Sequence, residues 1–235
     1  MNYTIFILFF ILSIRIFAQQ DSSSCIREVL SYEDKLYEKL DNEQTIYLNY
    51  KTTAIDWENN VASSEVKTYK NSNNIHFFSN EGLIYQDEND VFLILPKQRL
   101  IIIDKVTEEI KERRKNDNFT QLRKQFLLNS SLVFCKIIDS IQGIKEVRLR
   151  VQEELEGIIE IEEISYIYNT KTENIITTTV WYSNNYKIKK MITTYINFDK
   201  NSPYKFKKAN RYVLANNKKL LNKYQSFKLI DNRSN

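Results

Sequence analysis

The stretch EGLIYQDENDVFLILPKQRLIIIDK, from Glu81 to Lys105, decides the fold of this chain. It contains three short apolar runs separated by polar residues that are typical of turns. The runs are Leu83–Tyr85, Val91–Leu95 and Leu100–Ile103. Each run is too short to cross a membrane and too uniformly apolar for a strand that has one wet face. The stretch therefore predicts adjacent strands that need shelter on both faces.

Side chains alternate between the two faces of a strand, so apolar residues on both faces have to be covered. Phe92 and Ile94 face one side, whereas Val91, Leu93 and Leu95 face the other. Burying one such side chain contributes roughly 1.5–3 kcal/mol, so exposure of either face would be costly. Two interpretations remain open. The runs are central strands of a fully packed sandwich, or they belong to a curved sheet whose concave side holds an apolar ligand.

The rest of the chain places these strands in an α+β fold. Asp21–Leu40 carries an apolar stripe at helical spacing. Alternating segments that begin at Thr45 and at Lys145 predict two antiparallel meanders, and a helical segment at Phe119–Leu127 separates them. We therefore predict a curved antiparallel sheet, unclosed like half of a barrel. An N-terminal helix and a helical insert would cover one side of it.

The N-terminal residues predict export. Ile5–Ile14 is an apolar run, and Ala18 precedes the polar residues QQDSSS, as in a signal peptide that is cleaved after a small residue. An uncleaved N-terminal anchor is the alternative. We expect residues 1–18 to be removed and residues 19–235 to form a single domain of a periplasmic or secreted protein.

Cys25 and Cys135 are the two cysteines of the chain. Disulfides persist in exported proteins, so this pair is a disulfide candidate. A bond between them would close a loop of 110 residues and contribute roughly 4–5 kcal/mol. Two separate buried thiols are the alternative, because sequence spacing does not reveal proximity.

Positive charge is concentrated near the C-terminus. From Lys187 to Asn235 the chain has 13 Lys and Arg but only 2 Asp. The region Lys187–Lys228 is suited to an anionic membrane surface or an acidic protein partner. The alternative is pairing with the acidic run Glu153–Glu163 within the same fold. We expect no nucleic-acid partner, because the net charge of the exported chain is far from strongly basic.

The sequence offers little for catalysis. His76 is the one histidine, and we expect it at a polar surface or in a turn. A lone histidine is a poor metal site, since zinc takes several His or Cys ligands. The sequence contains no motif of a serine hydrolase, a phosphate-binding loop or a zinc protease. We therefore predict no catalytic residue, no metal and no cofactor.

Three segments of the chain resemble the periplasmic lipoprotein carriers of the LolA/LolB type. The similar segments are Ile75–Ile103, Ile167–Tyr182 and Lys228–Arg233. Asp87 matches the turn Asp of the family and Pro96 its proline, whereas Glu88 stands where the family has Gly. The resemblance implies an unclosed barrel whose hydrophobic cavity accepts the acyl chains of lipoproteins, with no catalytic residue.

The predicted function is that of an exported binding protein, without catalysis, that holds lipid acyl chains or a lipoprotein in an apolar cavity. The candidate lining residues are Tyr85, Phe92, Ile94, Trp181 and Tyr182. The sequence leaves open which side of the strands faces the ligand. The alternative is an exported structural or assembly protein, filled by its own side chains, that docks a partner through its basic C-terminal region.

Overall fold

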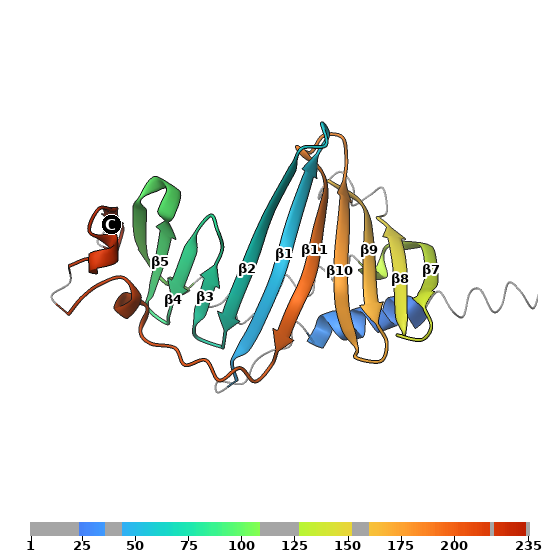
Figure 1. Cartoon of the computed structure of the whole chain (residues 1–235), viewed down its shortest axis with the longest axis horizontal. Coiled ribbons are helices and arrows are strands. Elements are labelled where there is room, and N and C mark those ends of the chain that lie inside the picture. Colours follow the sequence, from blue (N-terminus) through green and yellow to red (C-terminus); the bar gives the residue numbers. More distant parts are fainter. Residues whose placement is uncertain (1–23, 36–43, 109–126, 152–159, 217–218, 234–235) are drawn as a thin grey trace, which may run out of the picture. The chain divides into compact units, whose positions relative to one another are not determined.

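The structure is a computed structural model that describes residues 24–35, 44–108, 127–151, 160–216 and 219–233 (Figure 1). The predicted signal peptide, most of the predicted helical insert and much of the acidic run lie outside these ranges. No helix within the described ranges is long and apolar enough to span a membrane.

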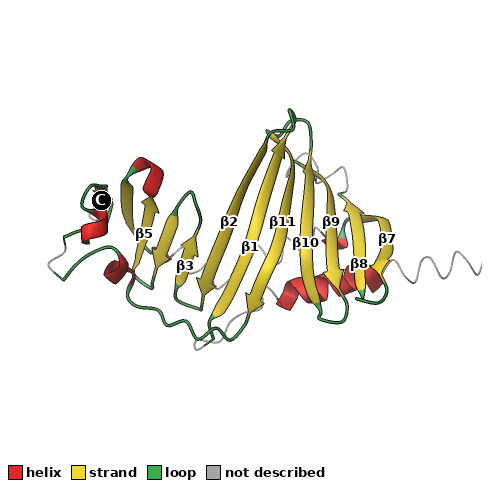
Figure 2. Ribbon diagram, in the orientation of Figure 1, coloured by secondary structure: helices red, strands yellow, loops and turns green. Residues whose placement is uncertain are grey.

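Strands make up most of the described chain, and twelve of them form one sheet (Figure 2). The strands are β1 (Ile46–Asp56), β2 (Val61–Lys70), β3 (Ile75–Phe78), β4 (Leu83–Gln86), β5 (Asp90–Leu95), β6 (Leu100–Lys105), β7 (Ser131–Asp139), β8 (Ile144–Arg150), β9 (Ile161–Asn169), β10 (Asn174–Tyr182), β11 (Ile188–Asp199) and β12 (Lys228–Asp231). The described chain also contains three short 3-10 helices, η1 (Pro96–Gln98), η2 (Ala209–Tyr212) and η3 (Asn222–Tyr224).

The strand order is β12-β6-β5-β4-β3-β2-β1-β11-β10-β9-β8-β7. The pairs from β2 to β6 and from β7 to β10 are antiparallel, whereas β12 runs parallel to β6. An edge strand stands at each end of this order, so the sheet of the described strands is unclosed. The predicted unclosed, largely antiparallel sheet with an N-terminal helix is thereby confirmed, although one pair is parallel.

The contacts within the chain divide it into two compact units. Unit 1 consists of Met1–Glu38, Ala54–Asn60 and Phe119–Ile192. Unit 2 consists of Lys39–Thr53, Val61–Asn118 and Thr193–Asn235.

In unit 1, the helix of residues 24–35 packs on the sheet through one apolar stripe. Cys25, Val29 and Tyr32 are buried at helical spacing, and the Tyr32 ring lies 5.7 Å from the ring of Tyr168 on β9. The Tyr168 hydroxyl donates to Glu28 at 2.8 Å. The sequence predicted a stripe of Ile26, Val29, Leu30, Leu36, Tyr37 and Leu40. Val29 is buried as predicted, Ile26 and Leu30 are partly exposed, and residues 36, 37 and 40 lie outside the described ranges.

A disulfide joins the same helix to β7. It links Cys25 and Cys135, which are 110 positions apart in the sequence, and no described cysteine is free. Because disulfides persist in oxidising compartments, this bond indicates an extracytoplasmic protein.

In unit 2, the apolar runs of the Glu81–Lys105 stretch build a core on one face of β4, β5 and β6. Phe92 lies opposite Ile103, and Ile94 lies opposite Ile101, so the four side chains point to the same side. All four have no exposed surface, and Tyr85 on β4 joins them. This face is the buried side of the sheet in unit 2.

The C-terminal part of the chain covers that core. We call residues 203–227 the C-terminal cover. Its apolar side chains in or against the core are Ala209, Tyr212, Val213, Leu214, Leu220, Leu221, Tyr224 and Phe227. The Asp87 carboxylate, in the turn between β4 and β5, accepts a hydrogen bond of 2.8 Å from the backbone of Ala209. One of the two faces is therefore filled by the chain itself.

Candidate apolar binding face

On the opposite face of unit 2, five apolar side chains form a row across five strands. Phe77 of β3 lies opposite Ile84 of β4, which lies opposite Leu93 of β5. Leu93 lies opposite Ile102 of β6, which pairs with Ile230 of β12. All five keep part of their surface exposed, unlike the core residues next to them in the sequence. We call these five residues the apolar row.

The strands give the apolar row its dimensions. Neighbouring strands lie about 4.8 Å apart, so five strands extend over roughly 19 Å. Leu95 and Leu100 pair with each other on the same face, two positions along the strands from Leu93 and Ile102, and they are also partly exposed. Thr68 of β2 pairs with Phe77 and ends the row on that side. The face is therefore an apolar strip with a polar end.

Three of the predicted lining residues lie on the buried face instead. Tyr85, Phe92 and Ile94 are 6%, 0% and 0% exposed and belong to one cluster. The C-terminal cover packs on them, so a ligand would reach them only by displacing the cover. Their role in ligand binding stays a prediction.

The other two predicted lining residues belong to unit 1. The Arg148 guanidinium lies 4.2 Å from the ring centre of Trp181. Tyr182 stacks on Tyr186, with 4.6 Å between the ring centres. Both side chains are partly exposed, but they contact a cation and a tyrosine and not an apolar cluster. Their role in ligand binding also stays a prediction.

His76 is buried, so its expected place at a polar surface or turn is wrong. It has no exposed surface, and its Nδ1 lies 2.8 Å from the Tyr204 hydroxyl. The rings of Tyr85, Phe206 and Tyr212 surround it with centre-to-centre distances of 5.0, 4.8 and 4.6 Å. Burial lowers the pKa of His76 to about 4, although the Asp87 carboxylate opposes this shift. The imidazole is therefore neutral at pH 7.

We expect this neutral histidine to make unit 2 less stable as the pH falls from 6.5 towards 4. In that window the unfolded chain binds a proton on His76 and the folded chain does not. The free energy of unfolding falls by up to about 3 kcal/mol, and the fall is complete near the pKa that His76 has in the folded chain. Urea unfolding of the wild type and of His76→Phe at about pH 7 and about pH 5 measures it. The wild type should lose stability relative to the variant at the lower pH, whereas a difference that is independent of pH contradicts the burial effect.

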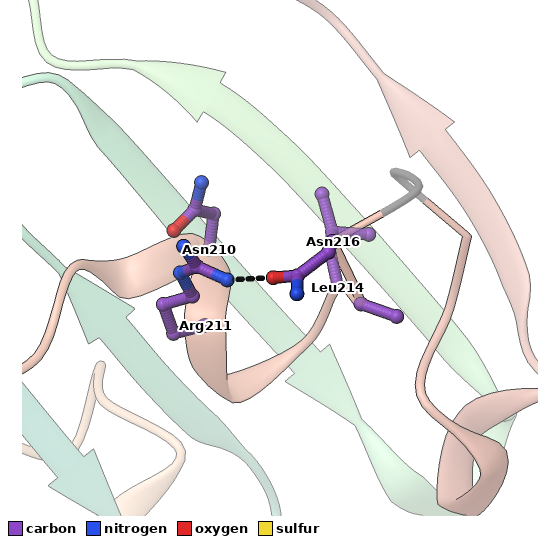
Figure 3. A pocket seen from close by; sticks show the side chains of 5 residues that line it. Asn210, Arg211, Leu214 and Asn216 are labelled. Atoms are coloured by element: carbon purple, nitrogen blue, oxygen red, sulfur yellow. Dashed lines mark hydrogen bonds between the residues drawn. The ribbon is translucent and has the colours of Figure 1, made fainter.

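The described residues offer no cluster of metal ligands. Within them, no group of three or more His, Cys, Asp or Glu side chains converges. A pocket of about 350 Å³ lies in the C-terminal cover, and its lining includes polar and apolar side chains (Figure 3). The lining residues are Asn210, Arg211, Leu214, Ala215 and Asn216. This pocket is separate from the residues of the apolar row.

Comparisons with known proteins give only distant matches. No family model and no curated protein matches the sequence. An uncharacterized conserved protein from Thermus thermophilus is similar in structure at 6% identity, covering 87% of this chain and 98% of that one, with a TM-score of 0.43. A LolA superfamily protein from Nitrosomonas europaea is similar at 9% identity, covering 74% and 94%, with a TM-score of 0.32. A putative outer membrane lipoprotein-sorting protein domain from Vibrio parahaemolyticus is similar at 5% identity, covering 79% and 96%, with a TM-score of 0.33.

Proposed function

We propose that this protein binds the acyl chains of lipids or lipoproteins on the apolar row and acts as a carrier without catalysis. The observation that supports the proposal is the alignment of five partly exposed apolar side chains across five strands. Contiguous exposed apolar surface on a folded protein is typical of a binding face. The disulfide supports an extracytoplasmic setting, where a carrier would meet lipids in transit.

The energetics favour a long, flexible apolar ligand over a compact one. The row crosses five strands, so a ligand that lies along it contacts each strand in turn. Each buried methylene contributes about 0.8 kcal/mol, so affinity should rise about fourfold for each methylene added within the length of the strip. A polar or rigid ligand would gain little from these side chains.

We expect Leu93→Asp to lower the affinity for a long-chain fatty acid about tenfold or more. Leu93 is the central residue of the row, and a carboxylate there removes apolar contact and repels the acid headgroup. Calorimetry with fatty acids of increasing length measures both the loss and the dependence on chain length. Because Leu93 is partly exposed, the circular dichroism spectrum should stay that of the wild type.

Ile137→Asp is the matched control. Ile137 is an aliphatic residue on β7 of unit 1, 64% exposed, so the same change adds the same charge to a strand outside the row. It should leave binding unchanged. Equal losses in the two variants, or an affinity that does not depend on chain length, would refute the proposal.

The alternative function also has an observation in its favour. The core face of unit 2 is filled by the chain's own side chains, as expected for an assembly protein that docks a partner. Mass spectrometry of purified protein after organic extraction separates the two functions. Acyl chains that co-purify support the carrier, and protein without them that binds an acidic partner supports the assembly role.

A further inference from the structure

The C-terminal cover has two chemically different sides. Tyr204 and Phe206 pack around His76, whereas Lys205 and Lys207, which alternate with them, are exposed. In an extended segment, successive side chains point to opposite sides. The aromatic side chains therefore face the sheet, and the lysines extend from the outer side of the cover.

The outer side is basic throughout. From Lys200 to Lys228 the sequence has nine Lys and Arg and no Asp or Glu. The exposed basic residues of the cover include Lys205, Lys207, Lys208, Arg211 and Lys223. Such a surface attracts anions, and its own segment contributes no acid to neutralise it.

The acidic run of unit 1 has other partners where the structure describes it. Glu163 accepts ion pairs from Arg148 and Arg150, both on β8. Glu160 accepts a hydrogen bond from Ser183. The described end of the run is therefore engaged within unit 1, and the expected pairing with the basic region does not involve Glu163.

The pocket in the cover adds a specific site to this surface. Arg211 and Asn216 face each other in it, and the Arg211 guanidinium donates to Asn216 Oδ1 (Figure 3). The remaining N–H groups of a guanidinium suit a phosphate. Leu214 and Ala215 supply apolar wall beside these polar groups.

We propose that the outer side of the C-terminal cover docks on an anionic phospholipid surface, with a headgroup phosphate at Arg211. The combination of a cation and an apolar wall fits the boundary between headgroup and acyl region. Lys205, Lys207 and Lys208, which precede the pocket residues in the sequence and are exposed, fit a charged surface. Leu229, which follows Lys228 and is 40% exposed, adds an apolar contact at the edge. This docking is independent of the apolar row.

Vesicle binding by the full chain tests the proposal. We expect binding to vesicles of equal parts phosphatidylcholine and phosphatidylglycerol, and little binding to phosphatidylcholine alone. Each cation near an anionic surface contributes about a fivefold gain, so Lys205→Glu with Lys207→Glu should weaken binding roughly 30-fold or more. Arg211→Gln should weaken it about fivefold. Added salt should weaken binding of the wild type, because the surface charges are screened.

The controls separate this proposal from its alternatives and from acyl binding. Lys51→Glu with Lys70→Glu changes two exposed lysines of unit 2 outside the cover by the same charge and should bind as the wild type does. Leu93→Asp should dock normally, and the cover variants should keep acyl binding. Equal binding to both vesicle types, or an equal loss in the Lys51 and Lys70 variant, would overturn the proposal. Saturable binding of inorganic phosphate or of polyglutamate without vesicle binding would also overturn it, in favour of a free anion or an acidic protein.

Discussion

Replacing both Cys25 and Cys135 with serine is expected to lower the free energy of unfolding by about 4 kcal/mol. The disulfide closes a loop of 110 residues, and its loss releases the unfolded chain from that constraint. It also holds the helix of residues 24–35 on β7, and Cys25 is buried, so a serine hydroxyl there adds a desolvation cost. Urea unfolding followed by far-ultraviolet circular dichroism measures the change.

Either single serine variant should lose about as much stability as the double variant, because removing one cysteine already breaks the bond. Reduction of the wild type should have the same effect. Glu28 of the helix keeps its ion pair with Lys145 and still accepts a hydrogen bond from the Tyr168 hydroxyl. The helix should therefore loosen without detaching at neutral pH. A change below about 1 kcal/mol in the double variant would show that the bond contributes little beyond these contacts.

The strands of unit 2 could be predicted from the sequence because apolar runs and turn residues alternate in a regular way. Asp87 shows the chemistry of one such turn, since its carboxylate accepts hydrogen bonds from the backbones of Asn89 and Asp90. The helix of residues 24–35 was equally clear from its apolar stripe. Elements with such local patterns can be predicted from the sequence alone.

Which side of the strands is buried could not be predicted, because a distant segment decides it. Phe92 and Leu93 are neighbours with similar apolar character, yet the C-terminal cover buries only the side of Phe92. The described part of the cover has two short 3-10 helices, and its basic residues suggested a surface for a partner or a pairing with the acidic run. The alternation of aromatic residues and lysines from Tyr204 to Lys207 was the signal that it packs on a surface.

The parallel pairing of β12 with β6 was also missed. The sequence predicted two antiparallel meanders and no parallel pair. The cover runs across the core face before the chain reaches β6, so β12 arrives in the same direction as β6. Such a crossover depends on tertiary packing, which strand periodicity does not encode.

Phe92→Ala is expected to lower the free energy of unfolding by about 4 kcal/mol. The Phe92 ring has no exposed surface and lies opposite Tyr85 on one neighbouring strand and Ile103 on the other. Its removal leaves a cavity that both the strands and the C-terminal cover would have to fill. Urea unfolding of unit 2, followed by the fluorescence of its tyrosines, measures the loss.

Phe77→Ala is the matched control, since it makes the same change on the opposite face of the same sheet. Phe77 lies in the apolar row and is partly exposed, so its truncation should cost only about 1 kcal/mol. It should instead weaken acyl binding, which Phe92→Ala should affect only through stability. If both variants lost about 4 kcal/mol, the row would be as buried in solution as the core. A ligand would then have no face on which to lie, because both sides of the strands would already be filled by the chain.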